Sequence, residues 1–160
     1  MIKIKFISPS KGTMTFNVVL EDIIAFMESR PDEKFNLIIG TDSHTKNQAC
    51  FVTAIIIHQI GKGARYYYHK KSQRKITSLR QKLFYEAAIS LEVASKVADF
   101  LARSGHEKLN VEIHLDVGNQ GDTRAMIKEI VGMVVGSGFN AKIKPDSCGA
   151  SKVADKHTKF

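Results

Sequence analysis

The stretch that decides the fold runs from Phe35 to His69 and reads FNLIIGTDSHTKNQACFVTAIIIHQIGKGARYYYH. Its apolar runs at 35–41 and 50–60 are short and rich in isoleucine, which is typical of buried β-strands. The sequence Gly61-Lys62-Gly63 favours a turn, after which residues 64–69 return as a third strand. The stretch therefore predicts a three-stranded antiparallel meander.

Outside this stretch, the hydrophobic spacing predicts helices alternating with single strands. The expected helices span 18–29, 77–103, 123–135 and 147–158, and the further strands span 111–117 and 141–144. A meander followed by strands joined through helical crossovers is typical of a mixed sheet, because the crossovers make the later strands parallel. We therefore expect an α/β fold in which helices on both faces flank a five-stranded mixed sheet, with one extra N-terminal helix.

The chain has 160 residues and 43% hydrophobic content, which suits one domain. Without internal repeats or Pro/Gly/Ser-rich linkers, we expect residues 1–34 to form an N-terminal extension and helix and residues 35–160 to form the core. The start MIKIKFISPS alternates apolar and charged residues, and no apolar run approaches the length of a membrane span. A soluble, cytoplasmic protein is expected, with Cys50 and Cys148 as buried thiols.

The positive charge is concentrated in one segment. The formal net charge is +8, and residues 43–85 contain nine Lys or Arg and no Asp or Glu. An excess of this kind favours an anionic partner such as RNA or DNA. Tyr66 and Tyr68 share one face of the third strand and can stack on bases, whereas a solvated charged face remains the alternative. The candidate phosphate-binding residues are Lys70, Lys71, Arg74 and Lys75.

Three acidic residues are candidate site residues because of where they fall in the expected elements. Asp42 and Asp116 each close an apolar strand, and ligands of α/β sheets bind beyond the carboxyl ends of strands. Taken singly, each is also a common strand-ending turn residue. Glu86 lies on the apolar face of the long helix, where a carboxylate is costly unless it is paired with a cation or recruited to a site. That face comprises Leu83, Glu86, Ser90, Val93, Val97 and Leu101.

Other candidates lie close to these acids in sequence. Asp155 on the last expected helix is a possible fourth acid, with an exposed helical Asp as the alternative. Asp146, just after the fifth expected strand, competes for the same role. His44 is a candidate for a role beside the acids. Arg124 and the loop 118–124 open a helix, so they can receive a phosphate or form a plain capped loop.

Three strings together resemble a known family. The strings are IIGTDSH at 38–44, HLDVGNQGDTR at 114–124 and KPDSCGASKVADKHT at 144–158. With the order of elements, they resemble the YkuK family of ribonuclease H-like proteins. The resemblance covers residues 35–160 and implies a ribonuclease H-like fold.

The resemblance also implies a function. It implies a nuclease site in which Asp42, Glu86, Asp116 and Asp155 hold two Mg²⁺ or Mn²⁺ ions and hydrolyse phosphodiester bonds in RNA or DNA. Hard oxygen ligands suit both ions, and a metal pair can activate water and stabilise the leaving oxygen. The alternative is a nucleic-acid-binding domain of the same fold without turnover. A salt bridge from Lys or Arg that fills the site would favour this alternative.

Overall fold

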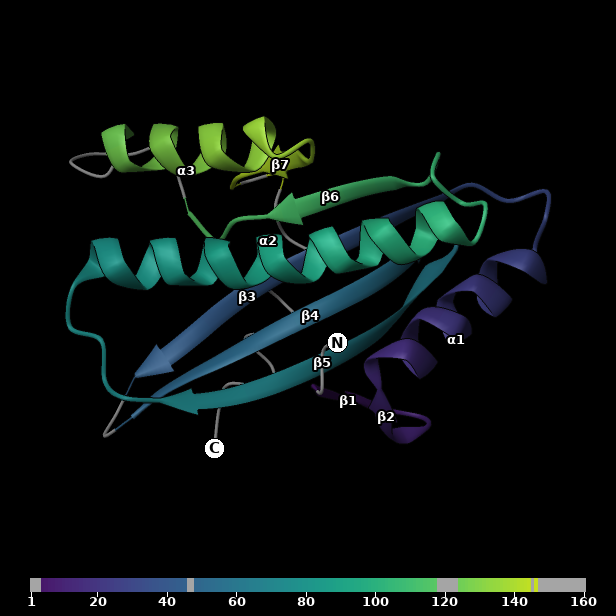
Figure 1. The fold of residues 1–160 in the computed structure, drawn as a ribbon, viewed down its shortest axis with the longest axis horizontal. Coiled ribbons are helices and arrows are strands. Elements are labelled where there is room, and N and C mark those ends of the chain that lie inside the picture. The colour runs from purple at the N-terminus through teal and green to yellow at the C-terminus, as the bar shows by residue number, and fades with distance from the viewer. Residues whose placement is uncertain (1–3, 46–47, 118–123, 145, 147–160) are drawn as a thin grey trace.

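The computed structural model describes residues 4–45, 48–117, 124–144 and 146 (Figure 1). Its strands are β1 (Lys5–Ser8), β2 (Gly12–Thr15), β3 (Phe35–Thr45), β4 (Ala49–Gln59), β5 (Gly63–Gln73), β6 (Asn110–His114) and β7 (Asn140–Lys142). Its helices are α1 (Phe16–Glu28), α2 (Leu79–Arg103) and α3 (Arg124–Gly136). The expected helix at 147–158 lies outside the described residues.

The strands form one mixed sheet in the order β2-β1-β5-β4-β3-β6-β7. The strands β3, β4 and β5 pair antiparallel as consecutive neighbours, which confirms the meander. The strand β6 then pairs parallel with β3, and β7 pairs parallel with β6. The mixed α/β architecture expected from the sequence is therefore confirmed.

The sheet has seven described strands, and the expectation of five was wrong. The two additional strands, β1 and β2, form a hairpin that joins β5 through the pair Ile7 and Tyr68. Phe6 is fully buried, and its ring centroid lies 5.9 Å from that of Phe16 at the start of α1. Burial of Phe6 and pairing with a distant strand hold this hairpin, so the segment before α1 is part of the sheet.

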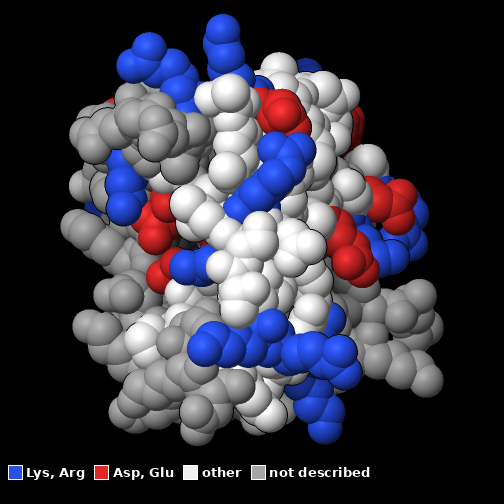
Figure 2. All heavy atoms as spheres, turned by 90° about the vertical axis from the view of Figure 1, so that its left-hand side faces the viewer, with Lys and Arg blue, Asp and Glu red and all other residues white. Residues whose placement is uncertain are grey.

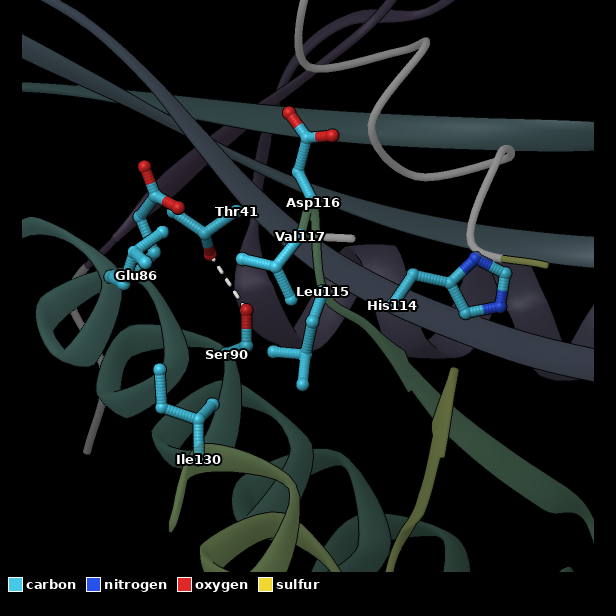
Figure 3. Close-up of a pocket in the computed structure, with 9 residues that line it drawn as sticks. Thr41, Glu86, Ser90, His114, Leu115, Asp116, Val117 and Ile130 are labelled. Carbon is cyan, nitrogen blue, oxygen red and sulfur yellow. Dashed lines mark hydrogen bonds between the residues drawn. The ribbon is translucent and has the colours of Figure 1, made fainter. Parts of the chain in front are cut away.

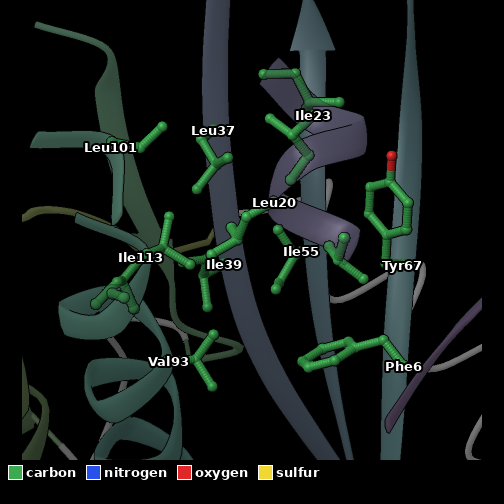
Figure 4. Packing of buried hydrophobic residues seen from close by; sticks show 14 of the residues in the cluster. Phe6, Leu20, Ile23, Leu37, Ile39, Ile55, Tyr67, Val93, Leu101 and Ile113 are labelled. Carbon is green, nitrogen blue, oxygen red and sulfur yellow. The ribbon is translucent and has the colours of Figure 1, made fainter. Parts of the chain in front are cut away.

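The described helices share one hydrophobic core on one face of the sheet. Figure 4 shows part of this core, with labelled residues from α1 and α2 and from strands of the sheet. Alternation along β3 places Leu37 and Ile39 on this face, opposite Ile57 and Ile55 of β4. The opposite face carries a separate small cluster around Ile38 and Ile56. Helices on both faces were expected, and within the described residues they cover this one face.

The long helix α2 determines where the candidate site forms. Ser78 caps its start by accepting a hydrogen bond from the backbone N–H of Gln81, and Gly105 beyond its end adopts a positive φ of 79°. The helix lies across the sheet, so its buried stripe faces β3 (Figure 1).

None of the helices in the described ranges has the length and apolar character of a membrane span.

Candidate functional site

A small pocket lies where β3, the segment after β6, α2 and α3 meet (Figure 3). Two of the predicted acids, Glu86 and Asp116, line it. The structure thus brings together a carboxylate from the long helix and one from the segment that follows a parallel strand. The lining comprises Thr41, Leu83, Glu86, Ser90, His114, Leu115, Asp116, Val117 and Ile130.

Glu86 is buried on the sheet-facing side of α2, as its helical phase predicts. Only 6% of the residue is exposed, and Ser90, one turn further along, is also buried. Ser43 of β3 donates a hydrogen bond of 2.5 Å to Glu86 Oε2. Within the described residues, Glu86 forms no ion pair, so the alternative of a buried acid neutralised by a Lys or Arg does not hold there.

A chain of buried hydroxyl groups fixes α2 against the sheet beside this carboxylate. The Thr41 hydroxyl lies 2.8 Å from that of Ser90 on α2 and 3.1 Å from that of Thr53 on β4. All three residues are at most 5% exposed. Buried hydroxyls are costly unless paired, so this chain specifies the position of the helix turn that follows Glu86.

The environment of Glu86 favours its protonated form. Burial raises the pKa of Glu86 to about 8, and the hydrogen bond from Ser43 acts in the opposite direction. The negative charges of Asp42 and Asp116 raise this pKa further, while the Lys82 ammonium lowers it. The three candidate acids therefore interact through their charges.

Asp42 and Asp116 lie at the same end of the sheet on neighbouring strands. The parallel ladder between β3 and β6 ends at the pair Gly40 and His114. Asp42 lies two residues after Gly40, and Asp116 lies two residues after His114. The structure corrects the strand ends: β3 continues to Thr45, so Asp42 lies inside the strand. The strand β6 stops at His114, so Asp116 lies in the segment beyond it.

Because successive side chains of a strand point to opposite faces of the sheet, Asp42 faces the side opposite to Thr41 and Ser43. The hydroxyls of Thr41 and Ser43 reach α2, so the side chain of Asp42 projects from the other face of the strand. In the antiparallel register Asp42 is opposite Val52, and Val52 is opposite Lys70. The acid thus shares a sheet face with one cation of the basic segment.

The sequence reasoning missed an ion pair at this site. Lys144 Nζ lies 2.9 Å from Asp116 Oδ1. The Asp116 carboxylate raises the pKa of Lys144, and the charge of Asp42 adds to the effect. One signal was present in the sequence, because Lys144 ends the last expected strand in the way that Asp116 ends its neighbour.

His114 is buried and only half satisfied. Its Nε2 lies 3.1 Å from Glu112 Oε1, and its buried Nδ1 has no hydrogen-bond partner among the residues that the structure describes. Figure 3 shows its ring turned away from Glu86 and Asp116.

The predicted phosphate-binding residues are all exposed, but they do not share one face. Alternation directs Lys70 and Lys71 to opposite faces of β5, and Lys71 Nζ donates a hydrogen bond of 3.1 Å to Tyr85 Oη on α2. Arg74 and Lys75 follow in the connection to α2. Figure 2 shows a band of Lys and Arg side chains low on the face in view, with Asp and Glu side chains and further Lys and Arg side chains above it.

The remaining predicted residues that the structure describes are not part of the pocket lining. His44 is partly buried on β3 opposite Cys50, which is a buried free thiol as expected. Arg124 is exposed as the first residue of α3. Asp146 is exposed, and its backbone N–H donates to Ile143 O at 2.8 Å. Asp155, Cys148 and the loop 118–123 lie outside the described residues.

Comparison with known proteins shows the family. The family model described as ribonuclease H-like matches residues 18–159. The chain belongs to the ribonuclease H-like family. It is also 37% identical over 166 aligned positions, covering 96% of both chains, to a protein of Bacillus subtilis (strain 168) named "Uncharacterized protein YkuK". The resemblance seen in the three sequence strings is thereby confirmed.

The family implies a divalent metal, which the site geometry tests. Among residues 4–45, 48–117, 124–144 and 146, no group of three or more His, Cys, Asp or Glu side chains forms a metal site. The expected convergence of Asp42, Glu86 and Asp116 to metal-bridging distance is therefore not seen there. The donor chemistry does fit, because the carboxylate oxygens of Glu86 and Asp116 in the pocket lining are hard ligands that suit Mg²⁺ or Mn²⁺.

Proposed function

We propose that this protein is a divalent-metal-dependent nuclease that hydrolyses phosphodiester bonds in RNA or DNA. The observation that carries the proposal is the pocket shared by Glu86 and Asp116 in a chain of the ribonuclease H-like family. Asp42 and Asp116 extend from neighbouring strands at the same end of the sheet, and Glu86 approaches from the helix that crosses it.

These residues have distinct roles in the proposed site. Asp42, Glu86 and Asp116 hold Mg²⁺ or Mn²⁺, with Asp155 or Asp146 as the fourth acid. The bound metal supplies an activated water and stabilises the leaving oxygen. Ser43 holds the Glu86 carboxylate in a fixed rotamer, and the hydroxyl chain through Thr41 fixes the helix that carries it.

The basic segment binds the substrate. Its cations lie between the first two acids in sequence, and β5 carries Lys70 and Lys71 on its two faces. Phosphate contacts fix the position of a nucleic acid without reading its sequence. The substrate is therefore RNA or DNA held by its backbone, with no requirement for one base sequence.

The second candidate function is a nucleic-acid-binding domain without turnover. The ion pair between Lys144 and Asp116 favours it, because a lysine ammonium neutralises one of the acids. Lys144 does not pair with Glu86, however, and Glu86 has no other ion pair in the described part of the chain. The side chain of Lys144 is also 58% exposed. It fills only part of the site, so the nuclease is the better supported function.

A cleavage assay separates the two functions. The purified protein is incubated with single- and double-stranded RNA and DNA oligonucleotides in Mn²⁺, in Mg²⁺ and in EDTA. The nuclease predicts cleavage of at least one substrate in Mn²⁺ or Mg²⁺ and none in EDTA. Binding of the same oligonucleotides without cleavage in any buffer would support the binding domain instead.

A further inference from the structure

The backbone holds Lys144 beside Asp116 independently of their ion pair. The backbone N–H of Leu115 donates to Lys142 O at 2.8 Å, and the backbone N–H of Lys144 donates to Val117 O at 2.9 Å. These bonds continue the contact between the two chain segments beyond the ends of β6 and β7. They place the lysine next to the acid whether or not the ammonium contacts the carboxylate.

The two partners differ in how firmly they are held. The Asp116 side chain is 25% exposed and lines the pocket, whereas the Lys144 side chain is 58% exposed. A long, exposed lysine loses little when it exchanges a carboxylate for water, because exposed ion pairs contribute little net free energy. The ammonium can therefore leave Asp116 without disturbing the fold.

The charges around Lys144 explain why a cation is needed at this position. Asp42 and Asp116 bring negative charge to one end of the sheet beside the buried carboxyl group of Glu86, and charged groups interact strongly where burial limits screening. Lys144 contributes one positive charge directly at Asp116 Oδ1. A divalent cation bound to the same oxygen would carry twice that charge.

We propose that Lys144 is the internal counter-ion of the site: it occupies Asp116 while no divalent cation is bound, and it competes with the cation for that carboxylate. This proposal rests on the proposed function, because it concerns the same acids. Lys144 thereby sets the metal concentration at which the site fills. It also keeps the acids neutralised when the concentration of divalent metal is low.

The test measures metal binding rather than cleavage. Binding of Mn²⁺ to the wild-type protein, to Lys144→Met and to Lys144→Gln is titrated by electron paramagnetic resonance, which detects the free ion. The matched control is Lys142→Met, since Lys142 is an exposed lysine two residues away on β7. Circular dichroism in EDTA verifies that each variant is folded. If Lys144→Met does not fold, Lys144→Gln is used for the test.

The outcomes separate this proposal from the proposed function. Removal of one positive charge next to the metal is expected to tighten Mn²⁺ binding about tenfold in both Lys144 variants. The Lys142 control should bind as the wild type does. If the wild type binds Mn²⁺ and the Lys144 variants bind equally or more weakly, the counter-ion proposal is wrong and the metal site stands. If neither the wild type nor any variant binds Mn²⁺, the counter-ion proposal and the proposed metal site are both wrong.

Discussion

Ser43 of β3 donates a hydrogen bond of 2.5 Å to the carboxylate of Glu86 on α2. Two residues earlier, the hydroxyl of Thr41 contacts that of Ser90 on the same helix. The residue between them, Asp42, projects from the other face of the strand. In the tripeptide Thr41-Asp42-Ser43, the two hydroxyl groups therefore contact α2, and the carboxylate of Asp42 is the candidate metal ligand.

Removal of the Ser43 hydroxyl should shift the titration of Glu86. Its hydrogen bond favours the charged carboxylate, so Ser43→Ala should raise the pKa of Glu86 above its value of about 8. The pKa can be measured by carbon-13 NMR of the side-chain carboxyl group in metal-free buffer. Ser72→Ala, at an exposed position of β5, is the control and should leave this pKa unchanged. An unchanged pKa in Ser43→Ala would contradict the described hydrogen bond.

Neutralisation of Glu86 should change how stability depends on pH. The folded chain raises this pKa from the ordinary value of 4.5 to about 8, so the folded state binds the proton more tightly than the unfolded state. This contribution to stability is fully present below pH 4.5 and is lost as the pH rises through 8. Glu86→Gln carries no such dependence, because its amide does not titrate.

The difference in unfolding free energy between Glu86→Gln and the wild type should therefore grow in favour of the variant by about 4 kcal/mol between pH 4.5 and pH 9. Urea unfolding in EDTA at several pH values measures this difference. Glu92→Gln, at an exposed position on the same helix, should show no such trend. If the difference in unfolding free energy between Glu86→Gln and the wild type does not vary with pH, folding does not raise the pKa of Glu86.

The buried hydroxyl chain makes an asymmetric prediction for stability. Thr41→Val deprives both Ser90 and Thr53 of a partner and should cost about 2 to 4 kcal/mol in the free energy of unfolding. Thr53→Val leaves the contact between Thr41 and Ser90 intact and should cost about 1 kcal/mol. Chemical denaturation of both variants gives the comparison. Equal losses would show that Thr41 is not the centre of the chain.

The elements with long, regular hydrophobic patterns could be predicted from the sequence, whereas the N-terminal strands β1 and β2 could not. The pattern of α2 placed Glu86 on its buried face correctly, because seven turns of helix leave little freedom in phase. The strand β1 has four residues and only two inward side chains, Phe6 and Ser8. Its stability comes from pairing with β5, far along the chain, and a local pattern does not contain that information.

The candidate site shows the same division between local and distant information. Asp42 and Asp116 could be found because each follows an apolar strand. The contacts of Ser43 with Glu86 and of Lys144 with Asp116 could not be predicted from local patterns alone, because each joins two elements whose relative placement depends on the assembled sheet. The extent of β3 to Thr45 likewise depends on its ladder with β4 rather than on hydrophobicity.

The basic segment makes a prediction about salt dependence. Neutralisation of two of its exposed cations, in Arg74→Gln/Lys75→Gln, should weaken nucleic-acid binding. It should also flatten the slope of log affinity against log salt by about 1.4 on single strands and 1.8 on duplexes. Fluorescence anisotropy over a KCl series in EDTA measures this slope. The control Lys96→Gln/Lys128→Gln removes two exposed lysines from α2 and α3 and should leave the slope unchanged. An unchanged slope in the first variant would place the substrate elsewhere.

The most direct test of the account compares binding and cleavage in one variant, Asp116→Asn. The oligonucleotide that the wild type cleaves is used in Mn²⁺ for cleavage and in EDTA for binding, with Asp99→Asn, an exposed position on α2, as the control. The account predicts that Asp116→Asn loses cleavage and binds the oligonucleotide as tightly as the wild type or slightly more tightly, because a negative charge near the phosphate is gone. Cleavage by Asp116→Asn at the wild-type rate would contradict the account.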